Sequence, residues 1–186
     1  MKMFQQLTEL VKQYGGNAVV NNPAVPNEQN DAVMNEASSS IVDGLKNMVA
    51  NGNISELAEM FQGNNAGNAS NPVVKNLIEQ VSGNLGSKFG LSNEASTGVA
   101  SNLIPQVLES LINKAKNPND SSLNIQDIIN SISGGNGGGL MDAVSKYGGQ
   151  FGLDQNNDGK VDMGDVTAAV SKKGGLGGLL GRLFGK

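Results

Sequence analysis

Residues 154 to 165 carry oxygen-bearing side chains at the spacing of a metal-binding loop. Counted from Asp154 as position one, the oxygen donors fall at positions one, three, five, seven, nine and twelve, which are Asp154, Asn156, Asp158, Lys160, Asp162 and Asp165. Lys160 would contribute only its main-chain carbonyl, and Gly159 stands at position six, where such a loop turns sharply. This pattern is that of an EF-hand loop, so the sequence predicts a Ca²⁺ site.

The clustering of charge in this loop also favours a bound cation. Four of the nine Asp residues of the chain lie within these twelve positions, and carboxylates so close together repel one another without a cation between them. The alternative is a surface loop of Asx turns that binds no ion. Asp165 stands where Glu is usual, and its shorter side chain makes bidentate ligation harder, which lowers calcium affinity or favours Mg²⁺.

The two flanks of the loop differ in their helical pattern. Glycines between 148 and 152 interrupt the incoming segment, whereas 163–173 is predicted to be helical. A loop followed by one helix resembles half of a dockerin module, in which Asp at position twelve is common. Dockerins carry two such repeats, but the other similar segment of this chain has Val49 at position three and Ala58 at position twelve. That segment is not expected to bind calcium.

The residue types that are missing exclude several kinds of catalysis. The chain of 186 residues contains no Cys, no His and no Trp, so it has neither a thiolate nucleophile nor an imidazole base or metal ligand. No sequence motif marks a phosphate loop or an oxyanion hole. The net charge is −4, and Arg182 is the one arginine, which argues against nucleic-acid binding. We expect a non-enzymatic protein that does not bind nucleic acid.

The elements that must hold the loop are predicted to be helices, because no stretch alternates with a period of two for long enough to predict a strand. Two helices are predicted at 3–14 and 28–50, followed by a short helix that Asn53 caps. A fourth starts at Asn71-Pro72, and a fifth is capped by Ser92 and runs to about Lys116. A short sixth helix is capped by Asn124. The first has an apolar face of Phe4, Leu7, Leu10 and Val11. A turn-rich linker is predicted over 17–27.

The composition and the positions of the glycine-rich stretches together predict the fold class and the division of the chain into segments. Gly accounts for 26 residues and favours turns and helix ends. We therefore expect an all-α bundle of several short helices, joined by glycine- and asparagine-rich linkers and followed by the EF-hand-like loop and helix. The predicted division is a helical body at 1–133, a glycine linker at 134–139, a calcium loop–helix element at 140–173 and a glycine-rich tail at 174–186.

The end of the chain is basic and partly apolar. No acidic residue follows Asp165, whereas Lys172, Lys173, Arg182 and Lys186 give the end a local charge of +4. We expect this tail to pack on the helical body, on a protein partner or on another copy of the chain. Contact with a membrane surface is less favoured, because its glycines weaken a helix. The chain shows neither a secretory signal nor a long apolar run, so a cytoplasmic location is expected.

The helical body also resembles a known family. The residues that carry this resemblance are the amphipathic start Met3-Phe4-Gln5-Gln6-Leu7, the segment Ala100-Ser-Asn-Leu-Ile-Pro-Gln-Val-Leu-Glu-Ser-Leu111, and the end rich in Gly and Leu. They are similar to a bacterial family of unknown function typified by YidB. The resemblance implies a bacterial, all-helical, intracellular protein with no catalytic residues to carry over. The calcium loop is not part of that pattern and would be an added element.

Overall fold

The computed structural model describes residues 2–62, 65–117, 120, 122–134 and 139, and every regular element in that part of the chain is helical. The α-helices are α1 (Lys2–Gly15), α2 (Asn30–Ala50), α3 (Ile54–Gln62), α4 (Pro72–Phe89), α5 (Asn93–Lys116) and α6 (Ile125–Ile132). A π-helical turn, η1 (Gly16–Val20), follows α1, and a 3₁₀ turn, η2 (Asn27–Gln29), precedes α2. The predicted all-α class is confirmed.

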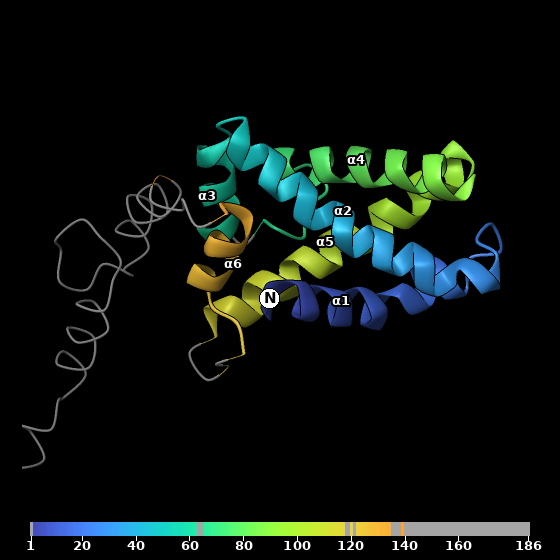
Figure 1. Cartoon of the computed structure of the whole chain (residues 1–186), viewed down its shortest axis with the longest axis horizontal. Helices are drawn as coiled ribbons and strands as arrows, with labels where there is room; N and C mark the ends of the chain where they lie inside the picture. Colours follow the sequence, from blue (N-terminus) through green and yellow to red (C-terminus); the bar gives the residue numbers. More distant parts are fainter. Residues whose placement is uncertain (1, 63–64, 118–119, 121, 135–138, 140–186) are drawn as a thin grey trace, which may run out of the picture.

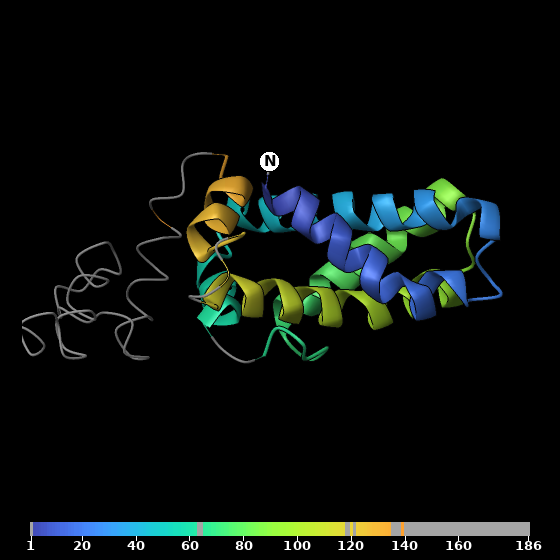
Figure 2. The ribbon, with the colours of Figure 1, turned by 90° about the horizontal axis from the view of Figure 1, so that it is seen from below.

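The four longest helices run lengthwise, and the two shortest lie together at one end. Figures 1 and 2 both place α3 and α6 at that end, while the turn between α4 and α5 and the connection from η1 to η2 lie at the other. α5 packs against α1 and α4, and α2 packs against α1 and α4. α6 contacts α1, α2 and α5, so it closes the bundle beside α3.

Side-chain caps begin three of the helices as the sequence predicts. The Oδ1 atom of Asn71 accepts from Val73 N at 2.9 Å at the start of α4, with Pro72 in the first helical position. Ser92 Oγ accepts from Ala95 N at 3.2 Å and begins α5. Asn124 Oδ1 accepts from Asp127 N at 2.8 Å and begins α6. Each cap satisfies a main-chain N–H that has no partner inside its helix.

One aliphatic core runs between the helices. Its largest fully buried side chains are Phe61, Met3, Leu7, Ile41, Leu45, Leu57, Met60, Leu77, Leu85, Leu103, Ile104 and Leu108. The predicted apolar face of α1 was wrong in one member, because Phe4 is 39% exposed whereas Met3 is 1% exposed. Met3 and Leu7 share the stripe of α1 that faces α2 and α5, and Phe4 lies one residue further round the helix.

Two further expectations differ from the structure. The helices α2, α4 and α5 have 21, 18 and 24 residues, so they are longer than the short helices expected from the glycine and asparagine content. Tertiary packing outweighs propensity here: Gly44 lies inside α2, where an added Cβ would meet Leu77 of α4. Gly16–Val20 is helical rather than part of a linker, because it buries Ala18 and Val19. Within the described residues, no helix is long and apolar enough to cross a membrane.

Candidate functional site

The predicted calcium ligands lie outside the part of the chain that the structure describes. Asp154, Asn156, Asp158, Lys160, Asp162 and Asp165 all fall in 140–186, as do the predicted exit helix and the basic tail. Their geometry therefore stays a prediction from the sequence. Among the described residues, no group of three or more acidic side chains lies close enough together to hold a metal ion.

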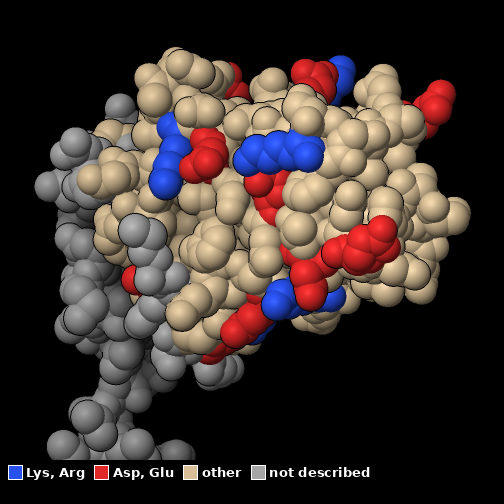
Figure 3. All heavy atoms as spheres, turned by 45° about the vertical axis from the view of Figure 1, so that its right-hand side comes forward, with Lys and Arg blue, Asp and Glu red and all other residues tan. Residues whose placement is uncertain are grey.

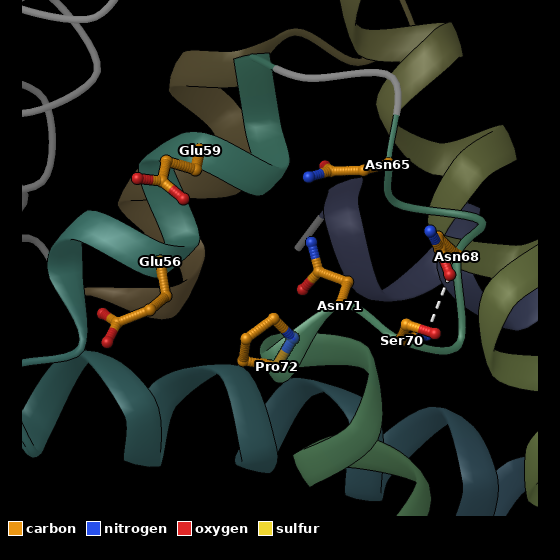
Figure 4. Close-up of a pocket in the computed structure, with 7 residues that line it drawn as sticks. All are labelled: Glu56, Glu59, Asn65, Asn68, Ser70, Asn71 and Pro72. Carbon is orange, nitrogen blue, oxygen red and sulfur yellow. Dashed lines mark hydrogen bonds between the residues drawn. The ribbon is translucent and has the colours of Figure 1, made fainter.

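The described part of the chain has a polar pocket between α3 and the connection to α4. It has a volume of about 240 Å³ and is lined by Glu56, Glu59, Asn65, Asn68, Ser70, Asn71 and Pro72. Figure 4 shows both glutamates on one face of α3, with the side chains of Asn65 and Asn71 reaching into the space between α3 and the connection. The lining contains carboxylates, amides, a hydroxyl and a proline ring, but no cationic side chain.

Successive turns place the asparagines around this pocket. The main-chain N–H of Asn68 donates to the carbonyl of Asn65 at 3.0 Å, and that of Asn71 donates to the carbonyl of Asn68 at 2.9 Å. The Oδ1 atom of Asn68 also accepts from Ser70 N at 2.9 Å, which is the dashed line in Figure 4. Such local bonds hold a turn in place of helical ones. The three-residue spacing of the asparagines therefore brings their side chains to one side of the connection.

Asn71 is the most buried polar group of the pocket. Its side chain is only 7% exposed, and its Oδ1 is occupied by the N–H groups of Val73 and Val74 at 2.9 and 3.5 Å. Its amide nitrogen makes no hydrogen bond to any described residue, and in Figure 4 it points into the pocket. Glu56 is half-buried and Glu59 is exposed. The pocket thus has an amide N–H donor and two glutamates among its lining residues.

Polar groups between α2, α4 and α5 behave differently, because they bond to one another. Asn84 of α4 donates to Ser40 Oγ at 2.8 Å, and Ser40 donates to Glu36 Oε1 at 3.1 Å. Lys88 Nζ lies 2.7 Å from the other oxygen of Glu36. Ser82 of α4 bonds in the same way to Ser96 and Thr97 of α5, at 3.2 and 2.9 Å. These groups stabilise helix packing and leave little capacity to bind a ligand.

Two titratable groups beside the end of α5 have shifted pKa values. The hydrogen bonds that Asp120 accepts from the side chain and main chain of Ser122 lower its pKa, and the charge of Lys114, 3.4 Å away, acts in the same direction. Burial lowers the pKa of Lys116, whose Nζ donates to the carbonyl of Gln62 at 3.0 Å. The bond from Lys116 ties α5 to the end of α3.

The residues between α3 and α4 were expected to form a glycine- and asparagine-rich linker, and the pocket that they line was not predicted. The available indication was the recurrence of Asn at 65, 68 and 71, a spacing of three that suits consecutive turns. Asn53 was predicted to cap the short helix that follows it, but no side-chain bond from Asn53 to a main-chain N–H of α3 is among the hydrogen bonds of the described residues.

Comparisons of this chain with protein-family models, with curated proteins and with solved structures find no match in any of the three. The resemblance to the YidB-like family and the similarity of the acidic loop to a dockerin repeat therefore stay predictions from short motifs. The proposals below depend on the residues of this chain alone.

Proposed function

We propose that this chain is a non-enzymatic calcium-binding structural or interaction protein, in which one EF-hand-like loop orders the C-terminal third. The observation that carries the proposal is the agreement of six ligand positions and one turn glycine with the EF-hand spacing between Asp154 and Asp165. The proposal also includes a bacterial origin, as the family resemblance suggests, and a cytoplasmic location.

The donor set suits a hard divalent cation. Asp154, Asp158, Asp162 and Asp165 would supply carboxylate oxygens, Asn156 an amide oxygen and Lys160 its main-chain carbonyl. A bound Ca²⁺ would neutralise much of the mutual repulsion of the four carboxylates. The ion would thereby draw residues on both sides of Gly159 into one turn, in a segment whose many glycines raise the entropy cost of ordering.

Isothermal titration of the full chain with Ca²⁺, and separately with Mg²⁺, tests the proposal. We expect one binding event per chain, abolished by Asp154→Asn together with Asp158→Asn. The matched control is Asp142→Asn, which removes a carboxylate from the same third of the chain but outside the loop. The absence of heat with both ions would overturn the calcium proposal.

A second substitution tests the assignment of position twelve. Asp165→Glu supplies the longer side chain that reaches Ca²⁺ with both oxygens in most EF-hands. We expect this variant to bind Ca²⁺ more tightly than the parent and to discriminate more strongly against Mg²⁺, because the larger ion accepts the additional oxygen. Equal or weaker calcium binding by the variant would contradict the proposed role of Asp165.

The basic end of the chain supports an alternative function, in which the protein self-associates or binds a membrane surface through residues 174–186. The specific observation is the local charge of +4 after Asp165, interleaved with Leu and Phe. Light scattering and co-sedimentation with anionic vesicles would compare the full chain with a variant that ends at Lys173. If the truncation changes neither measurement, this alternative is wrong.

A further inference from the structure

The two parts of the chain carry opposite charge. Residues 1–139 contain seven Lys and twelve acidic residues, a net charge of −5, whereas the basic tail, defined here as residues 172–186, contains four cations and no acid. Acidic side chains also form an interrupted band with few lysines on the face shown in Figure 3. General attraction between the tail and the body follows from these charges, but it does not by itself select a place.

The pocket beside α3 has the groups that a basic peptide segment requires. Glu56 and Glu59 present two carboxylates one helical turn apart, with no cation among the lining residues to neutralise them. Asn71 is 7% exposed, and its amide nitrogen is aimed into the pocket with no partner among the described residues, so it can donate to an acceptor there. A peptide carbonyl is such an acceptor, and the Lys or Arg side chain next to it would reach the carboxylates.

The tail has the complementary groups and sufficient reach. It contains glycines, which have no side chain, and its four cations lie near both ends of the segment in sequence. Figures 1 and 2 place α6, after which the basic part of the chain follows, at the same end of the bundle as α3. A segment such as that between Gly139 and Lys172 can extend to a length on the order of 100 Å. Chain length therefore does not prevent docking.

We propose that the pocket lined by Glu56, Glu59 and Asn71 is the docking site for the basic tail of the same chain. Single exposed ion pairs are weak, but the tether holds the tail at a high effective concentration, so a few weak contacts suffice. The docking is independent of the calcium site, since the tail lies beyond the loop and its cations are not ligands. Docking would leave the apolar residues of the tail less available to membranes or to other copies.

The absence of cysteine makes a direct test simple. A nitroxide placed on Gly185→Cys in the ¹⁵N-labelled full chain, in the presence of chelator, broadens amides near the place where the tail docks. We expect the amide peaks of Gly67, Asn68 and Ser70 to lose about half of their intensity or more, because a tethered tail occupies its site for much of the time. Amides at the far end of the bundle, at the starts of α2 and α5, should keep their intensity.

A pair of matched variants distinguishes the pocket from general attraction. Glu56→Gln with Glu59→Gln removes two charges from the pocket, while Glu28→Gln with Glu94→Gln removes two exposed charges near the starts of α2 and α5. We expect the first pair to abolish the broadening at 67–70 and the second pair to leave it. Raising the salt concentration from about 0.1 M to about 1 M should also weaken the effect, because the screening length falls from about 10 Å to about 3 Å.

Three results would overturn the proposal. Broadening that is uniform over the acidic surface, or equal for the two variant pairs, would mean that the tail has no preferred site. The same broadening at 67–70 in ¹⁵N-enriched chain that carries no nitroxide, after spin-labelled chain without ¹⁵N enrichment is added, would mean that the pocket receives the tail of another copy. Absence of broadening at 67–70 in the parent would mean that the pocket does not bind the tail at all.

Discussion

The polar groups between α2, α4 and α5 differ from those between α3 and α4 in whether they have partners. One network of hydrogen bonds and an ion pair joins α2 to α4 through Glu36, Ser40, Asn84 and Lys88. At the other place, Asn71 uses its oxygen for a helix cap and directs its nitrogen into an open pocket. The first arrangement contributes to stability, whereas the second leaves hydrogen-bonding capacity for a ligand.

This difference follows from the position of the residues in the bundle. The long helix α4 faces both α2 and α5 along its length, so a polar side chain of α4 meets a polar side chain on either neighbour. The connection between α3 and α4 is built from turns at one end of the bundle, where Asn side chains bond locally and point outward.

Removing a core side chain should affect both regions, because both depend on the same helical frame. Leu103 of α5 is 0% exposed, so Leu103→Ala is expected to lower the free energy of unfolding by about 2–5 kcal/mol. Urea denaturation followed by circular dichroism measures this loss. Ser101→Ala, an exposed neighbour on the same helix, is the control and should change the stability by less than about 0.5 kcal/mol.

Breaking this polar network should lower the free energy of unfolding less than removing a core side chain does. Ser40→Ala removes the acceptor of Asn84 and a donor to Glu36, so we expect a loss of about 1–3 kcal/mol. The matching variant on the pocket side is Ser70→Ala, whose exposed hydroxyl makes no hydrogen bond to a described residue. Equal losses for the two serines, measured by urea denaturation, would contradict the contrast between the regions.

Substitutions of Asn71 separate its two roles. Asn71→Ala removes the cap of α4 and is expected to cost about 0.5–2 kcal/mol. Asn71→Asp keeps an oxygen for Val73 N but removes the N–H donor that points into the pocket, so its thermal unfolding should match that of the parent. A large loss of stability in the Asp variant would show that the amide nitrogen has a structural partner.

The smallest effect concerns Asp120, whose pKa lies below its usual value of 3.8 because Ser122 donates to it. A carboxyl group whose pKa is lower in the folded state contributes stability above the unfolded pKa and loses it as the pH falls through the folded pKa. Ser122→Ala should therefore raise the pKa of Asp120. The difference in free energy of unfolding between the parent and this variant should shrink below about pH 4. Carboxyl-carbon NMR titration checks this shift, with Ser55→Ala as the control that leaves it unchanged.

Local patterns predicted the helices well because helix ends depend on neighbouring residues. Residue type alone indicates the N-terminal caps at Asn71, Ser92 and Asn124. It also agrees with the end of α4, where Gly90 has a left-handed main-chain conformation. The exposure of Phe4 and the burial of Met3 were not visible, because the two residues share one amphipathic helix and only the neighbouring helices determine which stripe is covered.

The residue types available for chemistry can be read directly from the sequence: it has no Cys, no His, and one acidic loop with EF-hand spacing between Asp154 and Asp165. That inference is local, because a calcium loop takes all its ligands from twelve consecutive residues. Helix packing is what brings Glu56 and Glu59 of α3 to line one pocket with the asparagines that precede α4. A pocket between two segments depends on how helices pack, and helix packing is set by the whole core rather than by the spacing of a few residues.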